Sequence, residues 1–425
     1  MKSYLNVLAT PGAWRFLAPA LVARLPYAMT QLGILLLVQW STGSYGAAGV
    51  AAAAAAFSQA FAGPQTGRLT DRFGQPRVLL PQVAVHAAAM GALLTLAAAH
   101  APIGVLVVLA ALAGASVPQV GAMVRARWAH TLGGSPRLGT AFAVESITDE
   151  LTFTMAPVLL VALSTGFSPV VALLVALALI VFGTVVFALV KVGAPVAMPV
   201  RVRSGGGVLR LRGVALLAAA FLAMGSVFGS LQVGITSFTA QLGMPGAAGP
   251  VYATFSGASV AGGLLYGALR WRIGAPVRLA AGLALLAVAT TALTAATSLP
   301  LLYGAAGLAG LVIAPVIITG YTIIERLTPA EVRTEAFTWL TGAIGLGIAT
   351  GAAVAGRLVD EAGPSLAFVV PPVMTGLAAV LVLTRLRSLR PRPETAPETA
   401  PDDGSAAMTG GETLTSAPGR ARPRG

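Results

Sequence analysis

Long apolar runs, separated by short breaks, constrain this chain more than any other feature of its sequence. Each run has about the 20 residues that an α-helix needs to cross a bilayer. The runs are continuously apolar, whereas the strands of a transmembrane β-barrel alternate apolar and polar residues. The sequence therefore predicts an all-α membrane protein with twelve spans, at residues 13–38, 46–66, 77–99, 102–124, 139–161, 168–190, 213–238, 248–269, 276–298, 300–322, 336–355 and 365–385.

The low charge of the chain, and the places where that charge lies, support the same class. Only 10% of the residues are charged, whereas a soluble domain carries about 25%. With both termini in the cytoplasm, all of the 27 lysines and arginines except Arg24 and Arg357 lie in cytoplasmic breaks, their flanks or the tails. Basic residues favour the cytoplasmic side, so we interpret the net charge of +13 as a topology signal and expect no nucleic-acid partner.

The stretch 191–212 divides the spans into two groups of six. It contains two prolines, three successive glycines and four arginines, a composition typical of a loop. We predict an N-terminal half at 1–190, a cytoplasmic linker at 191–212 and a C-terminal half at 213–386. The tail, 387–425, is rich in Pro, Thr and Glu, so we predict that it is disordered in the cytoplasm, with its first arginines near anionic lipid.

A short internal repeat relates the two halves. Residues 67–79 and 267–279 match at six of thirteen positions, and each copy follows the second span of its half. Repeated halves of six spans around a central linker are a transporter architecture.

The first copy resembles the signature loop of the major facilitator superfamily, G-x-L-x-D-R-x-G followed by basic residues. The matching residues are Gly67, Leu69, Asp71, Arg72 and Gly74; Gln75 and Pro76 replace the usual basic pair, and Arg77 lies just beyond. The resemblance implies the fold of that superfamily, with two pseudo-symmetric six-helix halves that rock around a central cavity.

The resemblance also implies that this loop latches the halves together in one state. Asp71 is expected to meet the positive N-terminal end of the eleventh span, near Phe337, while Arg72 and Arg77 bind helix carbonyls or lipid phosphates. In the second copy, the corresponding gating residues are Gly267, Arg272 and Gly274. The alternative is that the loop is only a positive-inside turn. Glu325, Glu331 and Glu335 are predicted to form a solvated loop before the eleventh span, or else to contact the Asp71 loop.

Four charged residues lie inside apolar runs: Arg24, Glu145, Asp149 and Glu150. A charge at mid-membrane is costly unless it is paired or hydrated, so each is a functional candidate. Arg24 and Asp149 lie at similar depths, roughly 16 Å at 1.5 Å per residue, which makes an ion pair feasible. We predict that this cluster couples transport to protons. The alternative is a static ion pair that fixes helix packing.

Several other polar residues have weaker assignments. Tyr27 and Gln31 in the first span, with Phe228 and Gln232 in the seventh, are predicted to line a substrate cavity. The alternative is hydrogen bonding to a neighbouring helix. Arg125 and Arg127, at the end of the fourth span, are predicted to snorkel to the membrane surface.

The sequence favours a transporter over an enzyme. It has no cysteine, no residues spaced as metal ligands and no nucleotide-binding loop. We therefore expect no metal and no other cofactor, and we expect that ATP does not drive transport. Arg24 is the only cation predicted to be buried, which favours proton-coupled export (antiport) of small apolar or amphipathic molecules, as in drug resistance. The alternatives are a proton-coupled importer (symporter) of a small metabolite and a non-transporting membrane sensor. The abundance of Ala and Gly, and of Arg over Lys, predicts a bacterial source, and we therefore expect a multi-pass protein of the bacterial cell membrane. We also expect a monomer.

Overall fold

The computed structural model describes residues 2–197, 208–211, 213–269 and 271–389. The N-terminal half contains α1 (Lys2–Leu8), α2 (Ala13–Arg24), α3 (Tyr27–Thr42), α4 (Tyr45–Phe73), α5 (Gln75–Ala98), α6 (Ile103–Ala115), α7 (Val120–Leu132), α8 (Arg137–Gly166) and α9 (Pro169–Leu189). The C-terminal half contains α10 (Val214–Gln241), α11 (Ala248–Ala268), α12 (Ala275–Thr294), α13 (Leu299–Leu327), α14 (Arg333–Ala362) and α15 (Val370–Thr384). The described residues also form short 3-10 helices: η1 (Val208–Arg210), η2 (Pro245–Ala247), η3 (Ala330–Val332), η4 (Pro364–Val369) and η5 (Leu386–Leu389).

Two of the predicted segments lie partly or largely outside the described residues. The predicted disorder of the tail concerns mainly residues 390–425, and half of the predicted linker falls on residues 198–207 and 212.

The long helices occupy the twelve predicted spans, and the all-α membrane fold is confirmed. Within the described residues, nine helical segments are long and apolar enough to cross a membrane. The other three predicted spans are α4, α8 and α11. Helix α8 is less apolar because it carries three carboxylates. Helices α4 and α11 are less apolar because they are rich in alanine, glycine and serine, which bury less apolar area than leucine.

The first and fourth spans are each broken into two helices near a proline. Pro26 lies between α2 and α3, and Pro118 lies between α6 and α7. Proline lacks an N–H donor and its ring clashes with the preceding helical turn. The prediction of two continuous helices was therefore wrong at these points. The breaks matter for the site, because Arg24 ends α2 and Gln119 precedes α7.

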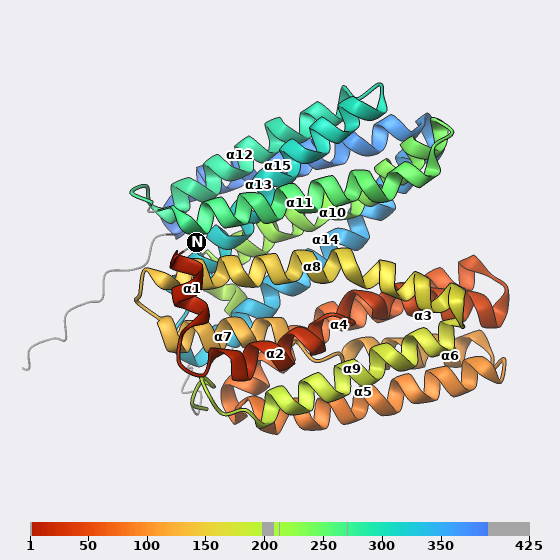
Figure 1. Cartoon of the computed structure of the whole chain (residues 1–425), viewed down its shortest axis with the longest axis horizontal. Helices are drawn as coiled ribbons and strands as arrows, with labels where there is room; N and C mark the ends of the chain where they lie inside the picture. Colours follow the sequence, from red (N-terminus) through yellow and green to blue (C-terminus); the bar gives the residue numbers. More distant parts are fainter. Residues whose placement is uncertain (1, 198–207, 212, 270, 390–425) are drawn as a thin grey trace, which may run out of the picture. The chain divides into compact units, whose positions relative to one another are not determined.

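Each half is a bundle of packed helices. In the N-terminal half, α2, α3 and α5 pack on α9, and α4 packs on α6; in the C-terminal half, α10 packs on α14, and α12 packs on α13 and α15. The halves adjoin where α4 packs on α14 and α8 packs on α11. Figure 1 shows α8 and α14 where the two sets of helices meet.

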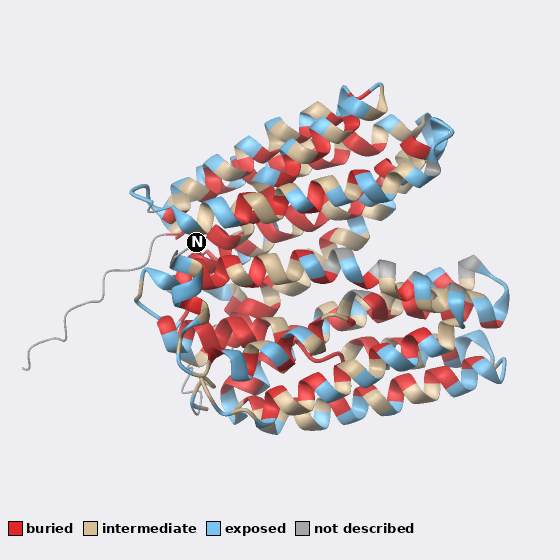
Figure 2. Ribbon diagram, viewed as in Figure 1, coloured by how far each residue is buried: buried red, intermediate tan, exposed pale blue. Residues whose placement is uncertain are grey.

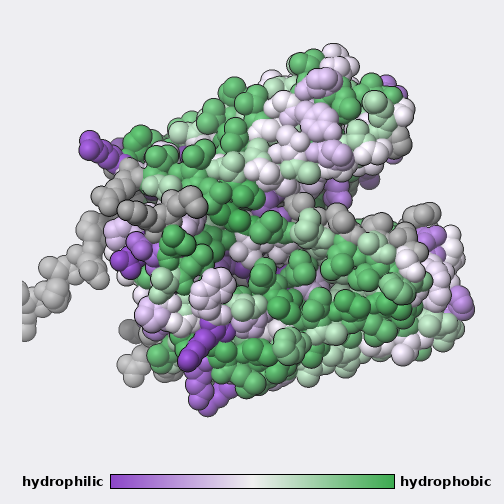
Figure 3. Space-filling model, viewed as in Figure 1, coloured by the Kyte–Doolittle hydropathy of each residue, from purple (hydrophilic) through white to green (hydrophobic). Residues whose placement is uncertain are grey.

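Burial follows this packing. Buried side chains run along the inner faces of the helices and concentrate where the halves meet, whereas the outward faces are exposed (Figure 2). Many of those outward residues are large and apolar, and Figure 3 shows apolar surface over much of the face in view. Exposed apolar side chains on this scale are expected where a helix bundle faces lipid.

We define the basic end of the bundle as the end where α4 meets α5, α7 meets α8, and α13 leads to α14. Its arginines include Arg68, Arg72, Arg77, Arg137, Arg326 and Arg333.

Candidate functional site

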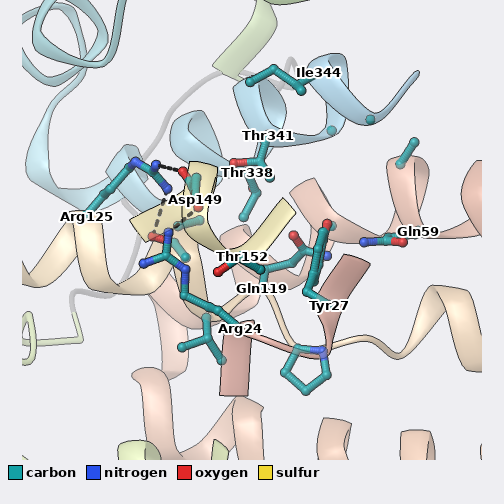
Figure 4. A pocket seen from close by; sticks show the side chains of 18 of the residues that line it. Arg24, Tyr27, Gln59, Gln119, Arg125, Asp149, Thr152, Thr338, Thr341 and Ile344 are labelled. Atoms are coloured by element: carbon teal, nitrogen blue, oxygen red, sulfur yellow. Dashed lines mark hydrogen bonds and ion pairs between the residues drawn. The ribbon is translucent and has the colours of Figure 1, made fainter. Parts of the chain in front are cut away.

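A cavity of about 110 Å³ lies between the two halves. It is lined by α2, α3, α4, α7, α8, α13, α14 and the break before α7. One water needs roughly 10–15 Å³ of such space, so the cavity can hold several waters or a small organic molecule. Its polar lining residues, most of which are drawn in Figure 4, are Arg24, Tyr27, Gln31, Gln59, Gln119, Arg125, Asp149, Thr152, Tyr321, Thr338 and Thr341.

A cluster of four charged side chains lies at one wall of the cavity, and three of them, Arg24, Arg125 and Asp149, line it. Arg24 forms ion pairs with both Glu145 and Asp149. Arg125 pairs with the second carboxylate oxygen of Asp149, which therefore lies between the two guanidinium groups (Figure 4). Three of the four groups are buried, but the Asp149 side chain is 32% exposed, and it lines the cavity. The structure therefore brings Arg24, Glu145 and Asp149 together, and Asp149 is the carboxylate that the cavity reaches.

Arg125 is fixed from several sides. Its Nη1 donates a hydrogen bond to the Gly121 carbonyl at 3.2 Å, and its guanidinium carbon lies 4.1 Å from the centre of the Tyr321 ring. Tyr321 belongs to α13 of the other half, so this cation–π contact joins the halves. Arg125 is 1% exposed and Arg127 is 0% exposed. The prediction that both arginines snorkel was wrong, because the break at Pro118 places α7 among other helices.

Arg127 has a different environment from Arg125. Its guanidinium donates hydrogen bonds to the side chain of Gln75 at 2.7 Å and to the carbonyls of Phe187 and Val192 at 3.0 and 3.2 Å. These acceptors are neutral; Gln75 and Phe187 belong to the N-terminal half, and Val192 lies in the segment that follows it. Arg127 therefore ties α7 to α5 and to the end of α9, outside the cavity.

The two remaining carboxylates of α8 face away from the cavity. Glu145 accepts a hydrogen bond from Trp128 Nε1 at 3.1 Å, so it is held from behind while it pairs with Arg24. Glu150 is 7% exposed and accepts a hydrogen bond from Ser259 Oγ of α11 at 3.2 Å. Glu150 therefore lies at the contact between the halves, apart from the four-membered cluster.

The predicted cavity residues divide between two locations. Tyr27 and Gln31 line the cavity, and Gln31 donates a hydrogen bond to Gln59 at 3.1 Å. Phe228 instead packs edge-on against Phe255 with the ring centres 5.6 Å apart, and Gln232 is exposed. Sequence reasoning missed Gln59, Gln119, Thr152, Thr338 and Thr341. Gln119 follows Pro118, and that proline was the one local signal for a break there.

The first signature loop contacts the other half at the basic end. Asp71 accepts hydrogen bonds from the backbone N–H groups of Thr334 and Glu335, at 3.2 and 2.9 Å. These residues begin α14, where the helix dipole favours a negative group. Burial nevertheless raises the pKa of Asp71 to about 7, although the N–H donors from Thr334 and Glu335 act in the opposite direction. Near neutral pH, the contact is therefore poised between the ionised and the protonated carboxyl.

Two neighbours of Asp71 complete this contact. Arg68 binds both carboxylate oxygens of Glu335, each at 3.1 Å. Gly67 leaves room for α14, because a Cβ there would lie 2.8 Å from Glu335 Cα. Arg68 was not predicted, although it lies three residues before Asp71 and thus on the same helical face. We call Gly67, Arg68 and Asp71 with the start of α14 the gate contact.

The other predicted loop residues lie outside the gate contact. Arg72 and Arg77 are exposed, and Arg72 lies 5.0 Å from the ring centre of Phe73. In the second copy, Arg272 is exposed and Gly274 precedes α12. Trp271 occupies the position that corresponds to Asp71 and donates a hydrogen bond to the Tyr266 carbonyl at 3.0 Å. The second copy therefore lacks the carboxylate that makes the first one a helix cap.

Two further side chains, Thr140 and Tyr4, contact backbone carbonyls of the other half at the basic end. Thr140 Oγ1 of α8 donates to the Gly267 carbonyl of α11 at 3.0 Å. The Tyr4 hydroxyl of α1 lies 3.0 and 2.8 Å from the carbonyl oxygens of Gly263 and Leu264. The helix that precedes the first span therefore also holds the C-terminal half.

Comparison with known proteins identifies the family. A family model described as Major Facilitator Superfamily matches residues 5–299 and 248–419. A search of curated proteins finds no match. Within the described residues, no group of three or more His, Cys, Asp or Glu side chains could hold a metal ion.

Three solved structures with a similar fold are described as transporters. The human organic anion transporter is 18% identical, with a TM-score of 0.67, and the alignment covers 88% of this chain and 100% of that one. A bacterial homologue of the iron transporter ferroportin in an outward-facing state is 15% identical, with a TM-score of 0.70 and coverage of 88% and 99%. A proton:xylose symporter is 13% identical, with a TM-score of 0.65 and coverage of 88% and 96%.

Proposed function

The chain belongs to the Major Facilitator Superfamily, whose members are membrane transporters, and we propose that it is a secondary transporter coupled to protons. The observation that carries the proposal is the charged cluster in the cavity wall. Two buried arginines share the carboxylate of Asp149, which is itself open to the cavity. Buried charges in a membrane protein are costly and mark ion or substrate pathways.

Asp149 is the proposed proton site. When its carboxylate is ionised, it neutralises Arg24 and Arg125. When it takes up a proton, it loses its negative charge and both arginines are left with weaker partners. Protonation therefore changes the charge of the cavity wall by one unit. A change of this kind can bias the equilibrium between two arrangements of the halves, provided that they bind the proton with different affinities.

The gate contact is the proposed closure of one side. It joins α4 to α14, and the hydrogen bonds of Tyr4 and Thr140 add further links at the same end. We infer that this arrangement is the state in which the basic end is closed, and that the gate contact separates when the basic end opens. Because burial brings the pKa of Asp71 close to neutral pH, the charge at the contact changes with pH in this range.

The basic end is proposed to be cytoplasmic. Its arginines follow the positive-inside rule, and Arg72 and Arg77 are exposed where they can meet anionic lipid. Both termini are proposed to lie on that side. The protein is also proposed to act as a monomer in a bacterial cell membrane.

The direction of transport depends on the charge of the cavity. Export of apolar molecules, as in drug resistance, was expected because Arg24 was the only predicted buried cation. Arg125 also lines the cavity, so that premise fails. The second cation favours the alternative, in which proton and substrate move in the same direction as in a symporter.

Energised inverted membrane vesicles test the proposal. A panel of lipophilic cations and neutral antibiotics is added to vesicles that carry the wild type or Asp149→Asn, and a quenched dye reports the pH gradient. Loss of the gradient in the wild type alone indicates antiport. Proton-driven uptake of a compound by right-side-out vesicles that carry the wild type, but not by those that carry Asp149→Asn, indicates symport. If neither preparation shows a difference between the wild type and Asp149→Asn, proton coupling through Asp149 is wrong.

A further inference from the structure

We propose that the cavity binds a small organic monocarboxylate, which replaces Asp149 between Arg24 and Arg125 while Asp149 carries the proton. This inference rests on the proposed proton coupling and names the substrate class of the same site.

The geometry around Asp149 is that of an occupied carboxylate site. Each of its two oxygens pairs with a different guanidinium, from Arg24 of α2 and from Arg125 of α7. Guanidinium groups favour carboxylates because their N–H donors match the two oxygens. The Asp149 side chain thus acts as an internal ligand at a position that opens to the cavity (Figure 4). The carboxylate of a substrate would meet the same donors from the cavity side.

The two arginines keep other contacts when Asp149 is protonated and its ion pairs with them are lost. Arg24 remains paired with Glu145, which Trp128 holds from behind. Arg125 remains bonded to the Gly121 carbonyl and stacked on Tyr321. Arg125 also has an Nε that is buried with no hydrogen-bond partner among the described residues. The binding groups for an anion are therefore held in place by contacts that do not involve Asp149.

The net charge of the cluster favours a ligand that carries one negative charge. Arg24 and Arg125 balance Glu145 and Asp149 while both carboxylates are ionised. Protonation of Asp149 leaves a net charge of about +1 in a low-dielectric wall, which is unfavourable. A monocarboxylate restores neutrality, whereas a cation adds to the excess charge. Proton and anion therefore bind together, and they are predicted to cross the membrane in the same direction.

The rest of the lining suits the body of a small acid. Ile344 and Ile348 of α14 offer apolar surface in the cavity, and Gln59 and Gln119 offer amide groups. Beyond the cluster itself, the polar lining consists of uncharged side chains. The groups near Asp149 whose ionisation can influence its proton are Arg24, Arg125, Tyr27, Tyr321, Glu145 and Glu150.

Calorimetric titration of the purified full-length chain tests this assignment. The probes are lactate and benzoate, with benzamide and benzylamine as matched neutral and cationic compounds. Titrations in two buffers with different ionisation enthalpies count the protons that accompany binding. We expect both carboxylates to bind with uptake of about one proton at pH 8, so that affinity falls about tenfold per pH unit above that. The neutral and cationic compounds are expected not to bind.

Variants separate the steps of the argument. Asp149→Asn mimics the protonated side chain, so it should bind benzoate without proton uptake and without the pH dependence. Arg125→Gln should lose benzoate binding, whereas Arg125→Lys should retain part of it, which separates loss of charge from loss of fold. Arg137→Gln removes an exposed arginine at the basic end and should behave like the wild type.

The possible failures are distinguishable. If benzylamine binds with release of a proton and neither carboxylate binds, the substrate class is wrong but proton coupling stands. If the carboxylates bind without proton uptake in the wild type, the proposed link between Asp149 and the anion is wrong. If neither lactate nor benzoate binds, the proposal is overturned, and the vesicle experiment decides separately whether transport is coupled to protons.

Discussion

Replacing Gly67 by alanine is predicted to favour opening of the basic end. Gly67 lies in α4, and a Cβ at this position would come within 2.8 Å of Glu335 Cα and 3.0 Å of Glu335 N. Both atoms belong to the backbone of α14, so they cannot move aside as a flexible side chain can. The two helices must therefore separate, or the alanine must strain the gate contact.

The size of the effect follows from overpacking. An extra methyl group in a well-packed contact costs about 1–3 kcal/mol. If that cost applies only while the gate contact is formed, the ratio of open to closed molecules rises roughly 5- to 150-fold. Alanine is also a better helix former than glycine by about 1 kcal/mol. That gain applies to α4 in both states, so it cancels from the ratio.

The absence of cysteine from the chain makes the assay direct. Cysteines introduced at Thr131 and Thr384, which are exposed at the basic end of the two halves, carry spin labels whose separation is measured by double electron–electron resonance. Gly139→Ala is the matched control, because a Cβ there has no other atom within 4 Å. Gly67→Ala should increase the long-distance population, and Gly139→Ala should not. Identical distance distributions for the two variants would refute the reasoning.

Three further predictions concern other contacts. Burial raises the pKa of Asp71 to about 7 in the closed state, whereas in water a carboxyl of this type ionises near pH 4, so the closed state binds the proton more tightly. Lowering the pH below 7 should therefore increase the short-distance population of the spin labels. Asp71→Asn should remove this pH dependence. Tyr4→Phe removes a hydrogen bond to α11 worth about 0.5–1.5 kcal/mol, and the same labels should report roughly a 2- to 12-fold shift toward opening. Arg127→Gln loses charged hydrogen bonds to Phe187 and Val192, so chemical denaturation should show a loss of about 1–3 kcal/mol with benzoate binding unchanged.

The sequence was sufficient for the fold because lipid imposes simple rules. Twelve apolar runs predicted the helices of an all-α membrane fold. The similar depths of Arg24 and Asp149 predicted their contact, and the signature motif placed Asp71 near the start of α14. Each of these inferences depends on position along a single helix, or on a pattern shared by a family.

The residues that were missed depend on where helices break and cross. Arg125 was placed at the membrane surface because the fourth span was taken as one continuous helix. Pro118 interrupts it, and α7 then turns Arg125 toward Tyr321, a residue nearly 200 positions away. Gln59 and Thr338 line the cavity only because α4 packs on α14. Phe228 and Gln232 have suitable chemistry for a cavity, but the rotation of α10 places them elsewhere.

The central claim is that Asp149 carries the coupling proton, and one reconstitution tests it directly. The full chain is placed in liposomes with a pH-sensitive dye inside, and an inward gradient of the best-binding probe is imposed, with empty liposomes as the control for passive entry. The account predicts that the wild type moves protons with the probe, and that Asp149→Asn exchanges labelled for unlabelled probe without moving protons. Proton movement by Asp149→Asn at the wild-type rate would contradict it.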